Sequence, residues 1–259
     1  MTLWDANTWL GHYPFRATPD ETVDGLLRRM DRHGIERAGV ANLNAAFYRD
    51  AHSANRELAH WIAPHRDRLI PAAVLNPCFP GWEQDLRECA EAWGMCALRL
   101  FPEFHRYALD GAECRGIVET TSALGWPVVI PIQLEDRRQH HWMDTTSAVT
   151  LNQIAALARE CPVADLLVLE ALGVENSLFV RDPDLAEARV SFEFSRMATV
   201  LQATIPRLLT ALGPARLLFG TGLPLKTPGP AILKLELLEA SETVKEMLGA
   251  GNLRRLLRM

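Results

Sequence analysis

Four charged residues stand inside apolar stretches of this sequence, where a charge is unusual. Asp5, Arg99, Glu170 and Glu193 each interrupt a run of residues that is typical of a buried strand. A charge that faced a covering layer of helices would be desolvated and unpaired, which is costly. We therefore expect these side chains to point inward, where Arg99 can hold a substrate carboxylate in a bidentate fork. The alternative is a structural ion-pair network around Arg99.

Two pairs of polar residues follow strand-like runs directly. His105 and Tyr107 come after the fourth run, in a loop that starts at Pro102, and His12 and Arg16 come after the first run. Because the pKa of histidine lies near neutrality, His105 is a candidate general acid or base. The other three polar side chains are candidate substrate contacts. The alternative for His105 is an exposed or packed histidine without a chemical role.

Seven consecutive polar residues, 135–141, follow the fifth run. Such a run is usually a solvated loop. Its position leaves open a second interpretation, in which Asp136 takes part in proton transfer and Arg138 binds an anion. Lys226 follows the last run, and a lysine there can form a Schiff base if desolvation lowers its pKa. A surface lysine is the commoner outcome.

Eight short apolar runs alternate with longer amphipathic segments along the chain. They span residues 3–9, 37–42, 69–75, 96–101, 127–132, 165–172, 188–194 and 216–220. Nearly continuous apolar runs are typical of parallel strands buried on both faces, and strict alternation places the helices outside them. Eight such units in 259 residues predict an α/β fold, a single (β/α)8 TIM barrel domain over residues 1–259. Active sites of such barrels lie at the C-terminal ends of the strands, where the polar residues above fall.

The ends of several helices are also visible in the sequence. Thr18-Pro19-Asp20-Glu21 predicts the start of the first helix, because it combines a capping box with proline at the first helical position. Glycines end four helical patterns, at Gly34, Gly94, Gly125 and Gly213. The pattern before Gly213 begins at Leu201. An extra helix over residues 242–257 is expected to pack against the barrel.

Composition narrows the class of protein and of partner. The formal net charge is −5, which gives no electrostatic reason to expect nucleic acid or an anionic membrane as a partner. The first ten residues resemble neither a signal nor a transit peptide, and no apolar stretch is long enough to span a bilayer. The five cysteines contain no Cys-x-x-Cys pair, which favours reduced thiols and a cytoplasmic location.

Both ends of the chain resemble the amidohydrolase-2 family. Residues 4–11, Trp-Asp-Ala-Asn-Thr-Trp-Leu-Gly, resemble its first strand, which usually carries Asp-x-His-x-His. Residues 217–224, Leu-Leu-Phe-Gly-Thr-Gly-Leu-Pro, resemble its eighth strand, usually Phe-Gly-Ser-Asp-x-Pro. The final residues 245–257 resemble its closing helix. The resemblance implies a metal-dependent TIM barrel acting on a small molecule, often as a dimer or larger assembly.

This sequence departs from the family at the positions that hold metal there. Asn7 and Trp9 replace the first-strand histidines, Pro131 and Ala171 replace those after strands five and six, and Gly222 replaces the aspartate that activates water. A catalytic zinc needs about three protein ligands. We therefore expect no metal ligands and no cofactor, and Asn7 becomes a candidate substrate contact. The alternative is a divalent metal such as zinc at a rewired site built from His12, His105, His140 and Glu170.

Three functions remain open from the sequence. The first is a small-molecule hydrolase or lyase, in which Asp5, His105 and Asp136 transfer protons. A substrate, which can be anionic, is then bound by the remaining candidates, which are Arg99, Arg16, His12, Asn7, Tyr107, Arg138, Glu170 and Glu193. The second is a non-catalytic barrel that binds a ligand or protein, which predicts mutually satisfied polar groups and no open pocket. The third is a metal hydrolase with a rewired site. A homo-oligomer is also expected.

Overall fold

The computed structural model of the chain describes residues 1–136, 138–200 and 203–259. Its strands are β1 Leu3–Leu10, β2 Ile35–Asn42, β3 Leu69–Pro71, β4 Ala73–Val74, β5 Leu98–Arg99, β6 Val128–Pro131, β7 Leu166–Leu169, β8 Val190–Glu193 and β9 Leu217–Leu218. The strands form two sheets, ordered β1-β2-β3 and β4 to β9. Within each sheet every strand pairs in parallel with the next. Each of the eight predicted runs overlaps one of these strands, or in one case two, and β1 and β2 extend beyond their predicted runs.

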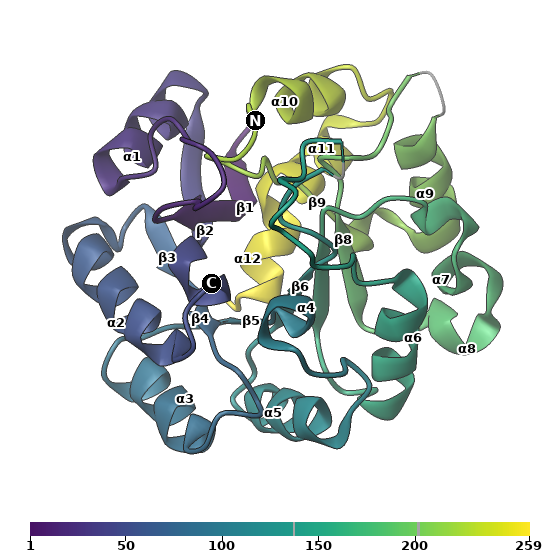
Figure 1. Cartoon of the computed structure of the whole chain (residues 1–259). Helices are drawn as coiled ribbons and strands as arrows, with labels where there is room; N and C mark the ends of the chain where they lie inside the picture. The colour runs from purple at the N-terminus through teal and green to yellow at the C-terminus, as the bar shows by residue number, and fades with distance from the viewer. Residues whose placement is uncertain (137, 201–202) are drawn as a thin grey trace.

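Backbone hydrogen bonds join the two sheets into one closed barrel (Figure 1). The strands β3 and β4 are two halves of one strand interrupted at Ala72, whose N–H donates to the Val40 carbonyl at 2.8 Å. At the other seam the Ala6 N–H donates to the Phe219 carbonyl at 3.0 Å, and the Trp9 N–H donates to the Leu223 carbonyl at 2.8 Å. These bonds confirm the predicted (β/α)8 barrel.

The helices lie outside the strands, as the alternation predicts (Figure 1). Between consecutive strands lie α1 Val23–Arg32, α2 Ala51–Ile62, α3 Trp82–Glu91, α4 Pro102–His105, α5 Ala112–Ala123, α6 Leu151–Glu160, α7 Leu178–Arg181, α8 Pro183–Ala186 and α9 Thr204–Leu212, and after β9 come α10 Gly229–Glu236, α11 Glu242–Glu246 and α12 Asn252–Leu256. Short 3-10 turns lie at Leu43–Ala46, Ala63–His65, Val174–Asn176 and Pro214–Arg216. Leu201, where we placed the start of the pattern before Gly213, is outside the described residues. Of the described helices, none is long and apolar enough to cross a membrane.

The first helix starts later than the sequence predicts. Its N-cap is Thr22, whose hydroxyl accepts a hydrogen bond from the Gly25 N–H at 3.2 Å. The Thr18 hydroxyl instead donates to Glu21 Oε2 at 2.9 Å, a bond between two side chains. Asp20 has φ of 61°, a left-handed conformation that a helix cannot contain. The predicted start at Thr18 is therefore wrong, and the segment is a turn.

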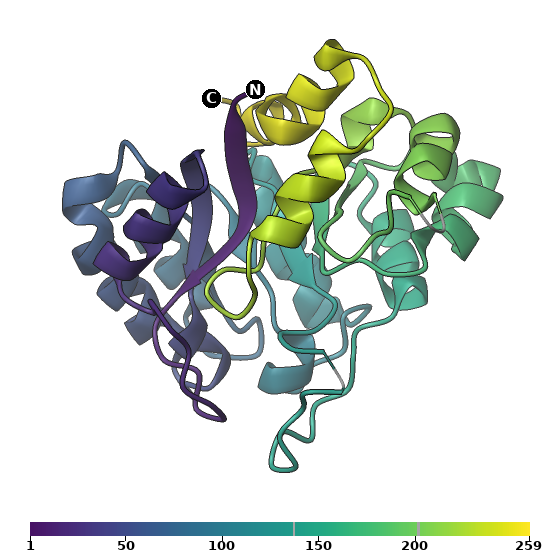
Figure 2. The same ribbon diagram turned by 90° about the horizontal axis from the view of Figure 1, so that it is seen from above.

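The end of the chain closes the barrel at the end opposite the mouth. The predicted C-terminal helix forms as α11 and α12, joined by a π-helical turn at Met247–Gly251. Leu253 and Leu256 are buried in the same apolar cluster as Ala6 and Ala97 of the barrel interior. Figure 2 shows both termini at this end, while the loop that follows β6 stands out from the opposite end. The mouth is thus free for the loops that follow the strands.

Candidate functional site

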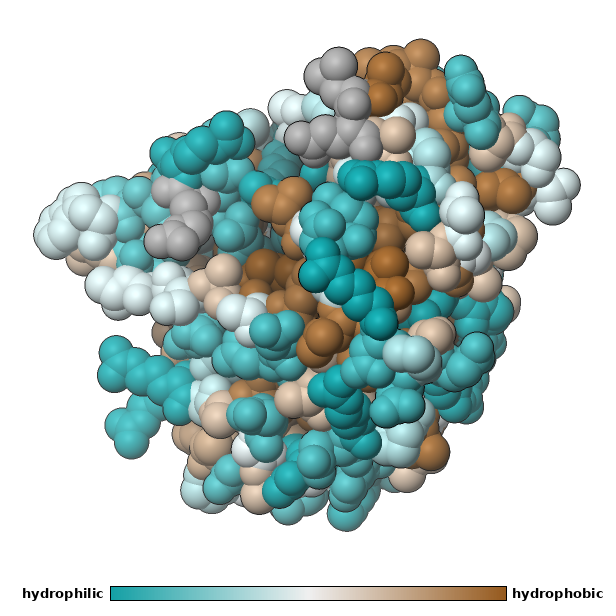
Figure 3. All heavy atoms as spheres, turned by 90° about the vertical axis from the view of Figure 1, so that its right-hand side faces the viewer, coloured by the Kyte–Doolittle hydropathy of each residue, from teal (hydrophilic) through white to brown (hydrophobic). Residues whose placement is uncertain are grey.

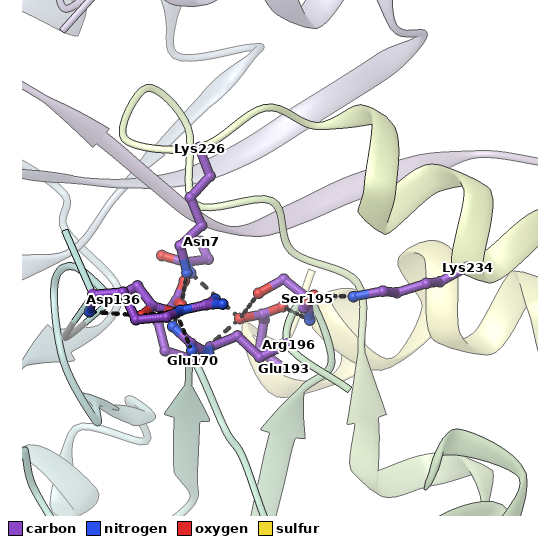
Figure 4. Close-up of polar contacts among 9 residues, drawn as sticks. Asn7, Asp136, Glu170, Glu193, Ser195, Arg196, Lys226 and Lys234 are labelled. Atoms are coloured by element: carbon purple, nitrogen blue, oxygen red, sulfur yellow. Dashed lines mark hydrogen bonds and ion pairs between the residues drawn. The ribbon is translucent and has the colours of Figure 1, made fainter. Parts of the chain in front are cut away.

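Three polar side chains from different strands meet at the floor of the mouth (Figure 4). Asn7 belongs to β1, Glu193 ends β8, and Glu170 directly follows β7. Asn7 Nδ2 donates to Glu170 Oε1 at 2.9 Å and to Glu193 Oε2 at 3.3 Å. The backbone N–H of Glu170 also donates to Glu193 Oε2, at 3.1 Å. All three residues are buried, so one amide holds two carboxylates together away from bulk water.

The backbone around this floor is shaped to place Glu170. Glu170 has φ of 60°, the left-handed region, which costs an L-residue roughly 1–2 kcal/mol. Opposite it, Gly222 has φ of 79°, and a Cβ there would lie 3.2 Å from Glu170 Oε1 and 3.0 Å from Lys226 Cδ. A glycine at this position therefore leaves room for the Glu170 and Lys226 side chains. The aspartate that the family resemblance places here would occupy that room.

Burial tunes the acidity of Glu193. Desolvation raises the pKa of Glu193 to about 7, although hydrogen bonds from Ser195 and Asn7 oppose the rise. The Ser195 backbone N–H donates to Glu193 Oε1, and the Ser195 hydroxyl donates to Oε2 at 3.0 Å. A carboxyl group with a pKa near neutrality exchanges protons readily at physiological pH. Glu193 can therefore hold or release a proton near neutral pH.

Replacing Glu193 with glutamine is expected to change how stability depends on pH. The carboxyl pKa is about 7 in the fold, against 4.5 for the ordinary group, so the folded state binds the proton more tightly. Its stabilising contribution is complete below about pH 4.5 and is lost as the pH rises to about 7. The free energy of unfolding of Glu193→Gln relative to wild type should therefore rise by on the order of a few kcal/mol across this window.

Urea unfolding of both proteins at about pH 5 and about pH 8 measures this difference. Glu187→Gln, an exposed carboxylate on the outer surface, is the control and should show no such change. An equal difference between Glu193→Gln and wild type at both pH values would mean that Glu193 keeps its ordinary acidity.

Two cationic side chains face the Glu170 carboxylate. Lys226, from the loop after β9, forms an ion pair with Glu170 Oε2. Arg196 Nη1 lies 3.9 Å from the same oxygen, while Arg196 Nη2 donates to Asp136 Oδ2 at 2.6 Å. Desolvation lowers the pKa of Lys226 to about 8, and the negative charge of Asp136 partly opposes this. The cations can thus attract an anion, and Lys226 can lose a proton near neutral pH.

Open space adjoins these charges on both sides of the Asp136–Arg196 ion pair. One hollow of about 690 Å³ is lined by Glu170, Leu172 and Arg196. A second, of about 660 Å³, is lined by Lys226, Leu225 and again Arg196. Both volumes fall in the range of small-molecule sites, roughly 300–1,000 Å³. A small molecule in either hollow would touch charged groups on one side and apolar side chains on the other.

Asp5 and Arg99 lie beneath this floor rather than in the mouth. Asp5 accepts hydrogen bonds from the backbone N–H of Asn7 at 2.9 Å and of Thr221 at 3.0 Å, and from the Thr221 hydroxyl. Desolvation raises the pKa of Asp5 to about 7. Its position ties β1 to the segment after β9. We therefore replace the predicted catalytic role of Asp5 with a structural one, the closure of the barrel seam.

Arg99 is fully enclosed by the barrel interior. Its Nη1 donates to the Thr8 carbonyl at 3.1 Å, and its guanidinium lies 4.0 Å from the centre of the Trp9 ring. Only 1% of the residue is exposed, and burial lowers its pKa to about 9. Because the guanidinium is packed against the strands, we no longer expect it to bind a substrate carboxylate.

His105 and Tyr107 are held by packing contacts. His105 Nε2 donates to the Ala45 carbonyl at 2.9 Å, and burial lowers its pKa. Burial thus disfavours the protonated ring, and its Nε2–H is directed at the Ala45 carbonyl rather than into the mouth, so we no longer expect it to act as a general acid. Tyr107 packs beside it, with ring centres 6.4 Å apart, and burial raises its pKa well above the usual value. Both residues support the α4 segment.

The remaining predicted contacts lie in the loops around the mouth. His12 is exposed, and its Nδ1 lies 3.4 Å from the Glu21 carboxylate in the first loop, away from Glu170 and Glu193. Arg16 donates to Glu135 Oε1 at 2.6 Å and to the Leu225 carbonyl at 2.8 Å, so it ties the first loop to the rim. Arg138 is largely exposed and forms two bonds to Asp136, at 3.0 and 3.1 Å. These bonds, with that from Arg196, lower the pKa of Asp136 and keep it ionised. Arg137 of the same polar run is outside the described residues.

Four residues of the site were missed in the sequence. Arg196 and Ser195 follow β8, Thr221 follows β9, and Lys234 lies on α10 and donates to the Ser195 carbonyl. Arg196 comes two residues after the predicted strand 188–194, so the rule that barrel sites follow strand ends would have found it. That rule does not find Lys234, because this residue lies within the helix α10 and not after a strand.

Known structures resemble this chain over almost their whole length. A dihydroxybenzoic acid decarboxylase from Polaromonas, with bound manganese and the inhibitor 2-nitroresorcinol, is 17% identical, with a TM-score of 0.75 over 99% of this chain and 97% of that one. A 5-carboxyvanillate decarboxylase from Novosphingobium aromaticivorans, with manganese and 3-methoxy-4-hydroxy-5-nitrobenzoic acid, is 13% identical, with a TM-score of 0.74 over 100% and 97%. A probable 2-pyrone-4,6-dicarboxylic acid hydrolase from Acinetobacter baumannii, with citric acid, is 15% identical, with a TM-score of 0.67 over 100% of both chains. At these identities the likeness shows the fold alone.

The family follows from the sequence itself. The family model described as amidohydrolase matches residues 4–259. The chain belongs to the amidohydrolase-2 family. No curated protein matches the chain. The family resemblance that both ends of the sequence indicated is therefore confirmed, and it extends over nearly the whole of this amidohydrolase.

The expectation that this amidohydrolase has no cofactor is contradicted. Two of the similar decarboxylases carry manganese, which points to a divalent metal cofactor in the family. The residues of this chain do not fit such an ion. Asn7 offers an amide between two carboxylates, Lys226 already pairs with Glu170, and within the described ranges no three His, Cys, Asp or Glu side chains gather as a metal-binding group. The rewired site with His12, His105 and His140 is thus not formed by the described residues, and the chemistry proposed below contains no step through a metal.

Proposed function

We propose that this amidohydrolase-family chain catalyses the hydrolysis or decarboxylation of a small anionic molecule by acid–base chemistry at the barrel mouth. One observation carries the proposal. Two buried carboxylates, Glu170 and Glu193, share the amide of Asn7 at 2.9 and 3.3 Å, and two cations face Glu170 from the open side. Grouped titratable residues with displaced pKa values beside a hollow are typical of catalytic sites.

Each side chain has a distinct task in this proposal. Arg196 would bind the anionic group of the substrate, because its guanidinium already faces carboxylates on two sides. Glu170, which lines the hollow of about 690 Å³, would take or give the proton of the substrate, and the buried Glu193, with a pKa of about 7, would accept or supply that proton in turn. Asn7 would hold both carboxylates in place. Leu172 and Leu225 would contact the apolar body of the substrate. The similar 5-carboxyvanillate decarboxylase and the probable hydrolase, which carry carboxylic acids, support this class of substrate.

The alternative is a barrel that binds a ligand without changing it. That alternative predicts polar groups that satisfy one another and leave no open pocket. Ion pairs do join Glu170 to Lys226 and Arg196 to Asp136, but hollows of about 690 and 660 Å³ adjoin them. Room for a small molecule beside groups that exchange protons near neutral pH favours an enzyme.

A panel of small carboxylates tests the proposal. The panel contains hydroxybenzoates, cyclic dicarboxylic esters and oxo acids, and turnover is followed by liquid chromatography and by release of carbon dioxide. The protein is purified without a nickel column and assayed with a chelator and with added manganese, so that either state of the enzyme is sampled. Turnover of an acid that is lost in Glu193→Gln supports the proposal. Saturable binding of an acid without turnover in any condition would favour the non-catalytic barrel.

Two other expectations stay predictions. A cytoplasmic location rests on the cysteine pattern alone. A homo-oligomer rests on the family resemblance, and large apolar residues are exposed, among them Leu233 and Leu237 on α10 and directly after it. Figure 3 shows apolar side chains gathered between hydrophilic ones on the side of the barrel where α7, α8 and α9 lie. Light scattering during size-exclusion chromatography should give a dimer or larger, and a monomer at every concentration would contradict this.

A further inference from the structure

Lys226 differs from the other basic residues of the chain in type and in place. Of 27 lysines and arginines only three are lysines: Lys226, Lys234 and Lys245. Almost all of the positive charge of the chain is therefore carried by arginine, which keeps its proton. The Lys226 side chain is only 26% exposed, yet it lines the hollow of about 660 Å³ at the mouth. The side chain therefore borders the hollow, while its Nζ is buried against Glu170.

The neighbours of Lys226 can take its proton. Its ammonium group contacts Glu170 Oε2 directly, and Glu170 is buried with the side chain 4% exposed. Desolvation lowers the pKa of Lys226 to about 8, so a minor share of the amine is neutral near pH 7. A neutral amine beside a carboxylate that accepts a proton and returns it is the arrangement that Schiff-base chemistry requires. Arginine at position 226 could not provide it.

We propose that Lys226 forms an imine with the carbonyl carbon of a small 2-oxo acid bound in this hollow. The inference deepens the proposed function, on which it rests. The Lys226 ammonium first gives a proton to Glu170. The neutral nitrogen then bonds to the carbonyl carbon as the C=O π bond breaks, and a proton passes from the nitrogen to the oxygen, which becomes the hydroxyl of a carbinolamine. Glu170 returns its proton to that hydroxyl, which leaves as water while the C=N bond forms. No oxidant or reductant is needed.

The arrangement of the two cations suits a 2-oxo acid among carbonyl compounds. Lys226 Nζ and Arg196 Nη1 both lie within 3.9 Å of the same atom, Glu170 Oε2. A substrate whose carbonyl carbon reaches Lys226 therefore has its carboxylate beside Arg196 only if the two groups are close together. In a 2-oxo acid they are directly bonded. Leu225, Pro230 and Ala231 line the same hollow and can contact a short apolar side chain.

Reductive trapping tests the inference. The full-length protein is incubated with pyruvate or 2-oxobutyrate and sodium cyanoborohydride, and the intact mass and the modified peptide are determined. With three lysines and the N-terminus as the only amines, the site is unambiguous. We expect one adduct at Lys226 in wild type. Lys226→Arg, which keeps the charge that pairs with Glu170, should lose it, and Lys245→Arg, a lysine on α11 outside the mouth, should keep it.

Binding of the same acids, followed by thermal shift without reductant, separates the two proposals. Binding that Arg196→Met abolishes, with no adduct at Lys226, would overturn the imine and leave the proposed anion site standing. Absence of both binding and adduct for every oxo acid would overturn the imine as well, and the carboxylate panel then decides the proposed function alone. Equal labelling of Lys226, Lys234 and Lys245 would show non-specific amine chemistry and would also overturn it.

Discussion

Glu170→Gln is expected to lower kcat/KM for the substrate found in the carboxylate panel by about 10²–10⁴-fold, the usual contribution of a positioned acid or base. The glutamine keeps an oxygen that can accept from Asn7, which now donates to Glu170 Oε1 at 2.9 Å. It removes the negative charge that faces Lys226 and Arg196, so these cations repel each other and Lys226 loses its proton acceptor. Steady-state kinetics with thermal unfolding of both proteins measures the effect.

A matched control separates this loss from a general effect of removing a carboxylate. Glu187→Gln changes an exposed residue that follows α8, on the outside of the barrel, and should leave kcat/KM unchanged. If Glu170→Gln folds with an unchanged melting temperature and retains wild-type kcat/KM, Glu170 has no part in catalysis. The proposed site would then lie elsewhere in the mouth.

Asp5→Ala is expected to destabilise the fold by about 3 kcal/mol or more, because one buried acceptor of several hydrogen bonds is lost. Three donors lose their acceptor at once, the N–H groups of Asn7 and Thr221 and the Thr221 hydroxyl, and all of them are buried. Each unsatisfied buried group costs about 1–3 kcal/mol. Since these bonds tie β1 to the segment after β9, the barrel seam opens. Urea unfolding measures the loss.

Two comparison variants define the cause. Asp5→Asn keeps an oxygen for the backbone N–H groups and resembles the protonated carboxyl that a pKa of about 7 favours below neutrality, so its loss should be much smaller. Asp31→Ala removes an exposed partner of Arg68 and should cost at most about 1 kcal/mol. A loss for Asp5→Ala no larger than that for Asp31→Ala would show that the seam does not depend on Asp5.

The strands were predictable because buried parallel strands leave a strong signal in the sequence. Between two amphipathic segments, a nearly continuous apolar run such as 127–132 is typical of a strand buried on both faces, and β6 lies within it. The start of the first helix was not predictable from the capping pattern. Thr18 and Thr22 are both of a residue type that caps helices, and the left-handed turn at Asp20 decides between them.

The site was predictable only in part, for a physical reason. Asn7, Asp136, Glu170 and Glu193 were identified from their places in or after strands, and the structure brings them together. Asp5 and Asn7 belong to the same strand, but Asp5 lies deeper, and a sequence does not give depth along the barrel. The partner of His105, the Ala45 carbonyl, lies 60 residues away in the chain and is known only once the fold has formed.

The binding of anions by Arg196 is the most direct test of the proposed site. Calorimetric titration of the best carboxylate into wild type, Arg196→Met and the control Arg207→Met gives three dissociation constants. Charged hydrogen bonds contribute about 1.5–3 kcal/mol, so Arg196→Met should weaken binding by roughly 10–150-fold. Arg207 lies on α9 with its side chain 56% exposed, and its variant should bind like wild type. Equal affinity of Arg196→Met and wild type would contradict an anion site at the barrel mouth.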